Sequence, residues 1–175
     1  MNAPPDLKLV LEQHAAMLAR IARGFEAETS ARQDLLQEIG LALWRALPSF
    51  RGQGSLGGFV AQVAHHVAVE HVARQRRHSS VTELSEHILD PVAGPESLAS
   101  KRQGSELLFA AIRQLPLNQA EVMVLQLEGF AQHEIAGMLG VSANVVGVRS
   151  SRARERLRTL MAGQGTGRAE VGNDG

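Results

Sequence analysis

Apolar residues recur at helical spacing along almost the whole chain, and this spacing most limits what the chain can fold into. Leu7, Val10, Leu11, Leu18 and Ile21 mark a first helix, because residues three and four apart share one helix face. Aromatic residues make up only 3% of the chain and Tyr is absent, which disfavours a β-sandwich or barrel. The pattern predicts an all-α protein with cores of Leu, Val, Ala, Ile and Met.

Two further helices are expected in the first half of the chain. One covers about residues 31–47 and ends at Pro48, because proline cannot continue a helix interior. Its apolar stripe is Leu36, Ile39, Leu43 and Leu47. The other follows the loop 49–54 and covers about residues 55–77. Its expected inner face is Leu56, Phe59, Val60, Val63 and Val67.

Charge divides the chain although the formal net charge is zero. Residues 1–77 carry 9 Lys and Arg against 7 Asp and Glu, and residues 101–162 carry 8 against 5. Residues 78–100 carry four acids and no Lys or Arg, with Asp-Pro and Gly-Pro pairs that are typical of turns. We therefore predict two small helical domains, 1–77 and 101–162, joined by a flexible acidic linker. The glycine-rich stretch 163–175 is expected to be a disordered tail.

The second domain is predicted to contain a helix-turn-helix motif. Its expected helices cover residues 102–114, 116–128, 132–139 and 143–161. Gly140 permits the tight turn before the last helix, and Ser142 is a favourable N-cap residue for it. The apolar inner side is expected to continue along that helix through Val145, Val148 and Leu157. In such a motif the second helix lies in the major groove of DNA.

The last helix carries five arginines and a single acid, Glu155. The N-terminal residues of a recognition helix reach the bases, and cations further along it contact phosphates. Base contacts are therefore predicted from Ala143, Asn144, Gly147 and Arg149. Backbone contacts are predicted from Arg152, Arg154, Arg156 and Arg158. The charges alone leave open a helical bundle with a solvated basic face.

The order of short motifs in this domain resembles region 4 of bacterial sigma-70 factors. The motifs are Leu115-Pro116, Glu128-Gly129, Glu134-Ile135-Ala136, Leu139–Ser142 and Arg152–Arg154. The resemblance implies that this domain binds the −35 promoter element, through Ser142 and the base-reading and arginine residues just named. The stretch Asn144–Arg149 departs from the more frequent Thr-Val-Lys-Ser-Arg arrangement, which puts the promoter sequence in doubt more than the function.

The stretch 34–52 reads DLLQEIGLALWRALPSFRG. On its residues alone it is an amphipathic helix with ordinary surface polarity. It resembles sigma region 2.2, which docks on the clamp helices of the polymerase β′ subunit. The resemblance implies docking by Asp34, Gln37 and Glu38, with apolar contact from Leu35. Trp44 is expected to pack in the core.

The loop 49–54 and the helix after it resemble sigma regions 2.3 and 2.4, which melt and capture the −10 element. A glycine-flanked loop can cradle an unstacked base, and single-strand capture needs cations along the strand. The resemblance implies −10 contacts from Phe50, Arg51, His65, His66, Arg74, Arg76 and Arg77. Phe59 stands where Trp is usual, and the histidine pair, Glu70 and Ala73 also depart from the family pattern.

Several classes of function are disfavoured. The chain has no Cys, which excludes disulfides, thiolate metal sites and a Cys nucleophile and fits a cytoplasmic location. No signal peptide, membrane-spanning run or catalytic motif is recognised. Adjacent His65 and His66 point about 100° apart on a helix, so a metal site with His71 is not expected. The sequence predicts neither an enzyme nor a bound metal or cofactor.

Across both domains the chain resembles the two-domain sigma factors of the extracytoplasmic-function (ECF) type. The resemblance implies three partners: core RNA polymerase at its β′ clamp helices and β flap, promoter DNA, and an anti-sigma factor. One alternative is a polymerase-independent helix-turn-helix regulator of transcription. Another is a sigma-like interaction protein that has lost promoter melting.

Overall fold

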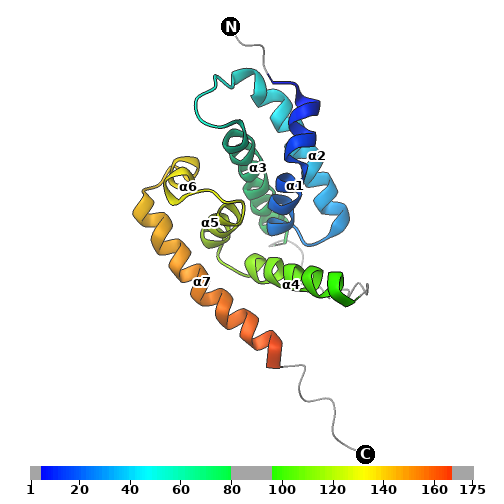
Figure 1. The fold of residues 1–175 in the computed structure, drawn as a ribbon, viewed down its shortest axis with the longest axis vertical. Helices are drawn as coiled ribbons and strands as arrows, with labels where there is room; N and C mark the ends of the chain where they lie inside the picture. Colours follow the sequence, from blue (N-terminus) through cyan, green and yellow to red (C-terminus); the bar gives the residue numbers. More distant parts are fainter. Residues whose placement is uncertain (1–4, 80–95, 167–175) are drawn as a thin grey trace, which may run out of the picture.

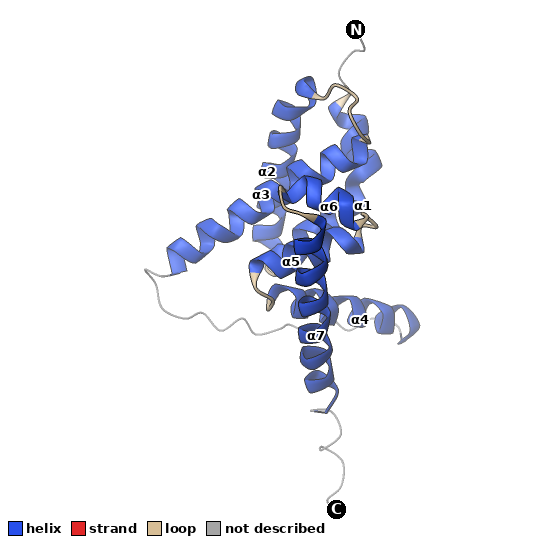
Figure 2. Cartoon of the chain, turned by 90° about the vertical axis from the view of Figure 1, so that its left-hand side faces the viewer, coloured by secondary structure: helices blue, strands red, loops and turns tan. Residues whose placement is uncertain are grey.

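The protein is all-helical in the computed structural model, which describes residues 5–79 and 96–166 (Figure 1, Figure 2). The first stretch holds α1 (Leu7–Phe25), α2 (Thr29–Ala46), a 3-10 turn (Leu47–Ser49) and α3 (Leu56–Ser79). The second holds α4 (Glu96–Arg113), α5 (Leu117–Leu127), α6 (Gln132–Leu139) and α7 (Ala143–Thr166). The predicted fold class is confirmed.

The predicted boundaries shift by a few residues. The acidic linker expected over 78–100 is shorter at both ends, because α3 continues to Ser79 and α4 begins at Glu96. The rest of that linker lies outside the described residues. Helix α7 runs to Thr166, so the predicted tail 163–175 starts within a helix, and its last nine residues lie outside the described ranges.

The first three helices form the N-terminal lobe. Asp6 caps α1, where its carboxylate accepts a hydrogen bond from the backbone N–H of Lys8 at 2.8 Å. The buried residues of α1 and α2 recur at the expected spacing: Val10, Leu18, Ile21, Leu35, Ile39 and Leu43. Helix α3 differs from its prediction, because Val60 is fully buried with the small Ala61, Ala64 and Ala68, while the other predicted apolar residues are only partly buried.

Helices α4–α7 form the C-terminal lobe. Gly140 ends α6 in the left-handed conformation with φ 64°, which glycine adopts without strain. The N–H of Val141 then donates to the carbonyl of Ala136 at 3.1 Å, so the chain reverses within a few residues into α7. The predicted helix-turn-helix is present, with the predicted boundaries for α6.

The two lobes pack directly against each other, with α1 lying on α4 and α5 (Figure 1). A Cβ atom on Gly24 would lie only 2.5 Å from Cγ2 of Val124, so these two helices touch at the glycine. Arg20 makes a bidentate pair with Glu128 at 2.8 and 2.7 Å, and Arg113 donates to the carbonyl of Arg23 at 2.6 Å. The buried apolar residues of both lobes form one continuous core.

Candidate nucleic-acid interface and docking face

Helix α7 turns one face toward its lobe and the opposite face toward solvent. The buried line on α7 is Val146, Ser150, Ala153 and Leu157. Val145 and Val148, which were predicted to lie on the inner side, are 37% and 43% exposed. That part of the prediction is wrong, because Val146, Ser150 and Ala153 occupy the buried line of this helix in place of Val145 and Val148.

The first turn of α7 places the predicted base-reading residues differently. Ser142 caps the helix, since its hydroxyl accepts from the N–H of Val145 at 3.3 Å. Ala143 and Asn144 are exposed. Gly147 is half-buried, and a Cβ there would lie 3.1 Å from Nε2 of Gln132. Gly147 therefore makes room for the neighbouring helix and offers no side chain to a base.

Arg149 leans toward α5 and away from the tip of the motif. Its guanidinium lies 3.9 Å from the carboxylate of Glu121, and the two side chains are 26% and 15% exposed. Burial raises the pKa of Glu121, and the charge of Arg149 partly opposes this shift. Arg149 thus lies on the flank of α7 beside α5, and not on the face opposite the core.

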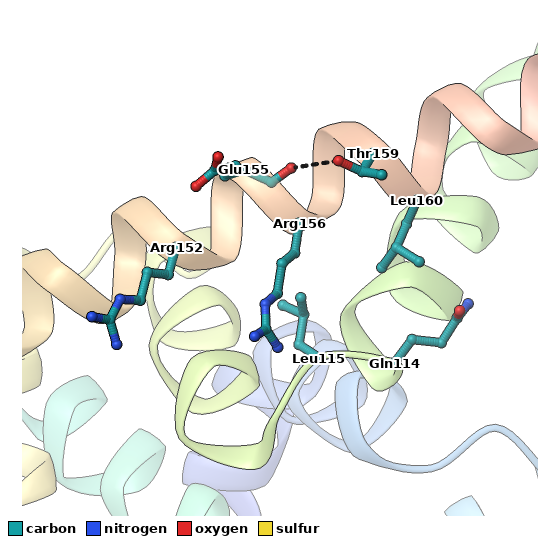
Figure 3. Close-up of a pocket in the computed structure, with 7 residues that line it drawn as sticks. All are labelled: Gln114, Leu115, Arg152, Glu155, Arg156, Thr159 and Leu160. Atoms are coloured by element: carbon teal, nitrogen blue, oxygen red, sulfur yellow. Dashed lines mark hydrogen bonds between the residues drawn. The ribbon is translucent and has the colours of Figure 1, made fainter.

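The remaining predicted arginines lie on two sides of α7. Arg152 and Arg156 line an open groove of about 500 Å³ between α7 and the turn joining α4 to α5, where Arg156 extends beside Leu115 (Figure 3). Arg154 lies on the other side and donates to Oε1 of Gln126 at 3.4 Å. All three side chains keep exposed guanidinium groups, so cations flank the outward face of the helix on both sides.

An exposed stripe on α2 carries two of the predicted docking residues. Asp34 and Gln37 are exposed, but Leu35 is 0% exposed and belongs to the core beneath them. Leu41 and Trp44 are 55% and 61% exposed, and their spacing places them on the same face. Leu35 therefore contributes no exposed surface to this face. Trp44 was predicted to pack in the core, and this prediction is wrong.

Leu41 and Trp44 were not predicted to be surface residues. Leu41 follows Gln37 by four residues and Trp44 follows Leu41 by three, so both continue the polar side of α2 and not its apolar stripe. That spacing was the available signal. We define the α2 face as Asp34, Gln37, Leu41 and Trp44.

Glu38 is only partly exposed because it pairs with Arg74 of α3. The sequence analysis assigned Glu38 to polymerase docking and Arg74 to the −10 element. The structure instead brings these two side chains together across the α2–α3 contact. Glu38 and Arg74 thereby neutralise each other within the N-terminal lobe, beside the exposed residues of α2.

Two glycines and an aromatic pair shape the loop before α3. Gly52 and Gly54 adopt φ values of 73° and 82°, which other residues rarely adopt. Phe50 packs against Phe59 with ring centroids 5.1 Å apart, and Arg51 is exposed beside it. An aromatic ring and a cation therefore stand at one edge of the loop.

His65 cannot contact DNA as predicted, because it is 6% exposed and lies in the core line of α3. Its ring meets Phe25 edge to face at 5.8 Å, and its Nε2 has no hydrogen-bond partner among the described residues. Burial lowers the pKa of His65 to about 4, with a further decrease from the charge of His66. The ring is therefore neutral at neutral pH.

The other predicted −10 residues remain at the surface. His66 lies 3.4 Å from Glu70 one turn later, and Arg76 and Arg77 are exposed in the last turns of α3. His71 is instead drawn inward to the carboxylate of Glu26 at 2.8 Å. Among the described side chains no group of three or more His, Cys, Asp and Glu is placed to hold a metal ion.

Together these features define a promoter-binding subunit of the sigma type. Its N-terminal lobe carries a glycine-containing loop followed by α3, and its C-terminal lobe carries a helix-turn-helix. Residues 10–78 match the family model for sigma-70 region 2, and residues 105–157 match that for sigma-70 region 4. The chain belongs to the ECF sigma factors of the sigma-70 family. A polymerase-independent regulator has no need of region 2, so the region 2 match removes that alternative.

Individual relatives agree with this membership. The chain is 31% identical over 134 residues to the ECF RNA polymerase sigma factor ShbA of Streptomyces griseus, covering 73% of this chain and 70% of the relative. It is 30% identical over 159 residues to the RNA polymerase sigma-H factor of Pseudomonas aeruginosa, covering 85% and 82%.

Two solved structures share the fold. One is the sigma factor RpoE in complex with the anti-sigma factor NepR from Bartonella quintana, with a TM-score of 0.67, 21% identity and coverage of 89% of this chain and 94% of that one. The other is CnrH in complex with the cytosolic domain of CnrY, with a TM-score of 0.63, 22% identity and coverage of 90% and 88%. No helix within the described ranges is long and apolar enough to cross a membrane.

Proposed function

We propose that this sigma factor docks on core RNA polymerase through the α2 face and selects promoters with its two lobes. The α2 face supports this role because two large apolar side chains, Leu41 and Trp44, stand exposed beside Asp34. Exposed Trp beside polar and charged side chains is typical of a binding hot spot, because Trp is enriched among the residues that carry most of the binding energy. This face is the single observation that carries the docking proposal.

The α2 face is tested by co-elution of the full chain with sigma-free core polymerase. We expect the wild-type chain to co-elute, and Asp34→Arg or Trp44→Ala to lose about tenfold or more in affinity. Glu12→Arg is the matched control, because Glu12 is an exposed acid on α1, away from the α2 face. Wild-type affinity in Asp34→Arg and Trp44→Ala would remove α2 as the docking element.

Duplex −35 DNA is assigned to α7, with its exposed first turn toward the bases and its flanking arginines toward the phosphates. The −10 strand is assigned to the loop at Phe50 and Arg51 and to the cations of α3. Because Arg74 is paired with Glu38, Arg76, which is exposed near the end of α3, is better placed than Arg74 for phosphate contact. None of these roles needs a catalytic residue, and a factor of this kind works in the cytoplasm beside the polymerase.

The packed lobes must separate for both promoter elements to be bound together. The elements lie about 25 base pairs apart by their names, which is about 85 Å of B-form DNA. A compact chain of 175 residues has a radius of gyration of about 16 Å. We therefore propose that the closed arrangement is the unbound or inhibited form and that polymerase takes up an opened form.

An anti-sigma factor is the proposed partner of the closed form. One of the similar solved structures is a sigma factor in complex with an anti-sigma factor, RpoE with NepR, and CnrH is likewise in complex with another protein, the cytosolic domain of CnrY. The open groove beside Leu115 and Arg156 is a surface of the C-terminal lobe available to such a partner or to the β flap. With no Cys in this chain, thiol-based sensing would belong to the partner.

A further inference from the structure

The outermost part of the recognition helix is apolar, which is unusual for a surface meant for DNA. Val145 and Val148 are among the few large apolar side chains that the structure leaves exposed. Both lie in the first two turns of α7, beside the exposed Asn144. An explanation in terms of core packing fails, because the core line of the helix is carried by Val146, Ser150 and Ala153.

Helix geometry places these residues opposite the core. Successive residues are about 100° apart around a helix, so Asn144 and Val148 lie within about 40° of each other. Both point nearly opposite to Val146, which is 0% exposed. Val145 lies beside this pair on the side of Arg149 and Arg152. The outward ridge of the recognition helix thus carries, in order around the helix, the amide of Asn144 and the branched apolar side chains of Val148 and Val145.

The charges around this ridge fit one kind of occupant. Arg149, Arg152 and Arg156 lie on one side of α7, and Arg154 and Arg158 lie on the other. The only acid on the helix, Glu155, comes after the ridge. A major groove is bordered by a phosphate strand on each side and is about 12 Å wide, so it meets a helix with cations on both flanks and a reading ridge between them.

We infer that Val145 and Val148 read thymine 5-methyl groups in the major groove, with Asn144 positioned to bind an adenine edge. The thymine methyl is the one apolar group that a base pair presents in the major groove, and Asn pairs bidentately with adenine N6 and N7. The site therefore selects a −35 element with A·T pairs where the first turns of α7 enter the groove. This inference rests on the proposed function and names the ligand of that site.

The test uses the thymine methyl as the probe. A random-sequence duplex library is selected with the full chain, both alone and with core polymerase, and the enriched duplex is then made with uracil at each thymine in turn. Uracil lacks only the 5-methyl group. We expect an enriched motif containing A·T pairs, and about fourfold weaker binding for each contacted thymine that is replaced.

A matched set of variants assigns the effect to the valines. In each of the variants Val148→Ala and Val145→Ala, the duplexes with thymine and with uracil at the position that this valine contacts should bind equally. The reason is that the γ-methyl groups of the valine, which contact the thymine methyl, are gone. Alanine is the best helix former, so these exposed substitutions leave the helix intact. Met161→Ala is the control: Met161 is 40% exposed on the same helix but lies about 20 Å further along, and this variant should still discriminate.

The outcomes separate this inference from the proposed function. If the wild-type chain binds uracil and thymine duplexes equally, or if discrimination survives in both valine variants, the thymine reading is overturned and the sigma assignment stands. If core polymerase fails to bind the chain but the chain alone discriminates through Val148, the docking proposal fails and the thymine reading stands. No enriched duplex in either selection overturns the thymine reading.

Discussion

Helices α3 and α7 were both assigned to DNA, and in each the core line combines one valine, Val60 or Val146, with small residues, whereas the other valines predicted to be buried lie at its edge or outside it. In α3 this line draws His65 inward beside Ala61, Ala64 and Ala68 and removes it from the DNA surface. In α7 it leaves Val145 and Val148 outside and adds them to that surface. The same packing rule therefore removes His65 from the predicted DNA-binding residues of α3 and adds Val145 and Val148 to the candidate DNA-binding residues of α7.

The reason is the distance between helices. Small side chains let two backbones approach closely, so a helix that sits among several neighbours buries its alanines and serines. The large apolar residues then lie at the edges of the contact. Valine position is consequently a poor guide to the phase of these two helices, whereas Leu18, Ile21, Ile39 and Leu43 are buried in α1 and α2 as predicted.

The largest expected effect tests the burial of His65. Its pKa falls from 6.5 to about 4 on folding, so the unfolded chain binds more protons between these values. The free energy of unfolding should therefore decrease as the pH falls from 6.5 toward 4, by up to about 3 kcal/mol. Urea unfolding followed by circular dichroism at several pH values measures this.

The variant His65→Leu should remove most of that pH dependence, because no buried ring is left to protonate. His66→Leu, at an exposed position, is the control and should keep most of the wild-type pH dependence, because burial and not the charge of His66 is the main cause of the lowered pKa of His65. An unchanged profile in His65→Leu would place the acid sensitivity elsewhere and would return His65 to the candidate DNA residues.

A smaller effect compares two helical glycines. A Cβ on Gly24 meets Val124 of the other lobe at 2.5 Å, whereas a Cβ on Gly40 meets nothing within 4 Å. Gly40→Ala should stabilise the chain by about 0.5–1 kcal/mol through helix propensity. Gly24→Ala should instead lose about 1–2 kcal/mol of lobe packing, because the overpacked contact must open.

Small-angle X-ray scattering gives the second readout for the Gly24 variant. We expect a larger radius of gyration for Gly24→Ala and an unchanged one for Gly40→Ala. If both variants stay as compact as the wild-type chain, the lobes are not held by the α1–α5 contact.

A similar comparison within the C-terminal lobe concerns Gly147. Its α-hydrogen faces the amide of Gln132, which donates to the carbonyl of Ala143 at 2.5 Å. Gly147→Ala should displace Gln132 and cost a net amount of roughly 1 kcal/mol, since lost packing outweighs the gain in helix propensity. Thermal unfolding measures it; a clear stabilisation would show that Gly147 is free to carry a side chain toward DNA.

The smallest effect concerns the flanking arginines. Arg154→Ala should weaken duplex binding about equally for all sequences and reduce the slope of log affinity against log salt by about 1, because one phosphate contact is lost. Titrations at several salt concentrations give the slope. A loss confined to one base position would instead make Arg154 a base reader.

Much of the fold was predictable because its signals are local. Pro48 and Gly140 mark helix ends by their backbone chemistry, and the Leu and Ile spacing places α1 and α2. The candidate site was predictable to the level of the element: α2, the loop before α3, and α7. The exposure of individual side chains within each element was less predictable. Leu35 was expected at the surface and is buried, whereas Trp44 was expected in the core and is exposed.

The contact between the lobes could not be predicted from the sequence. Arg20 and Glu128 are 108 residues apart, and the Glu128-Gly129 motif gives no indication of a partner in α1. Their pairing depends on how α1 meets the end of α5, which only the packed structure supplies. The same holds for Glu38 and Arg74, which the sequence assigned to different partners.

Transcription in vitro tests the central claim most directly. Sigma-free core polymerase is mixed with the full chain and genomic DNA fragments, and the 5′ ends of the transcripts are mapped. The account predicts a limited set of start sites that share upstream motifs, lost with Asp34→Arg and kept with Glu12→Arg. Stable binding to polymerase without any start sites above core polymerase alone would contradict it and would identify a sigma-like chain that no longer opens promoters.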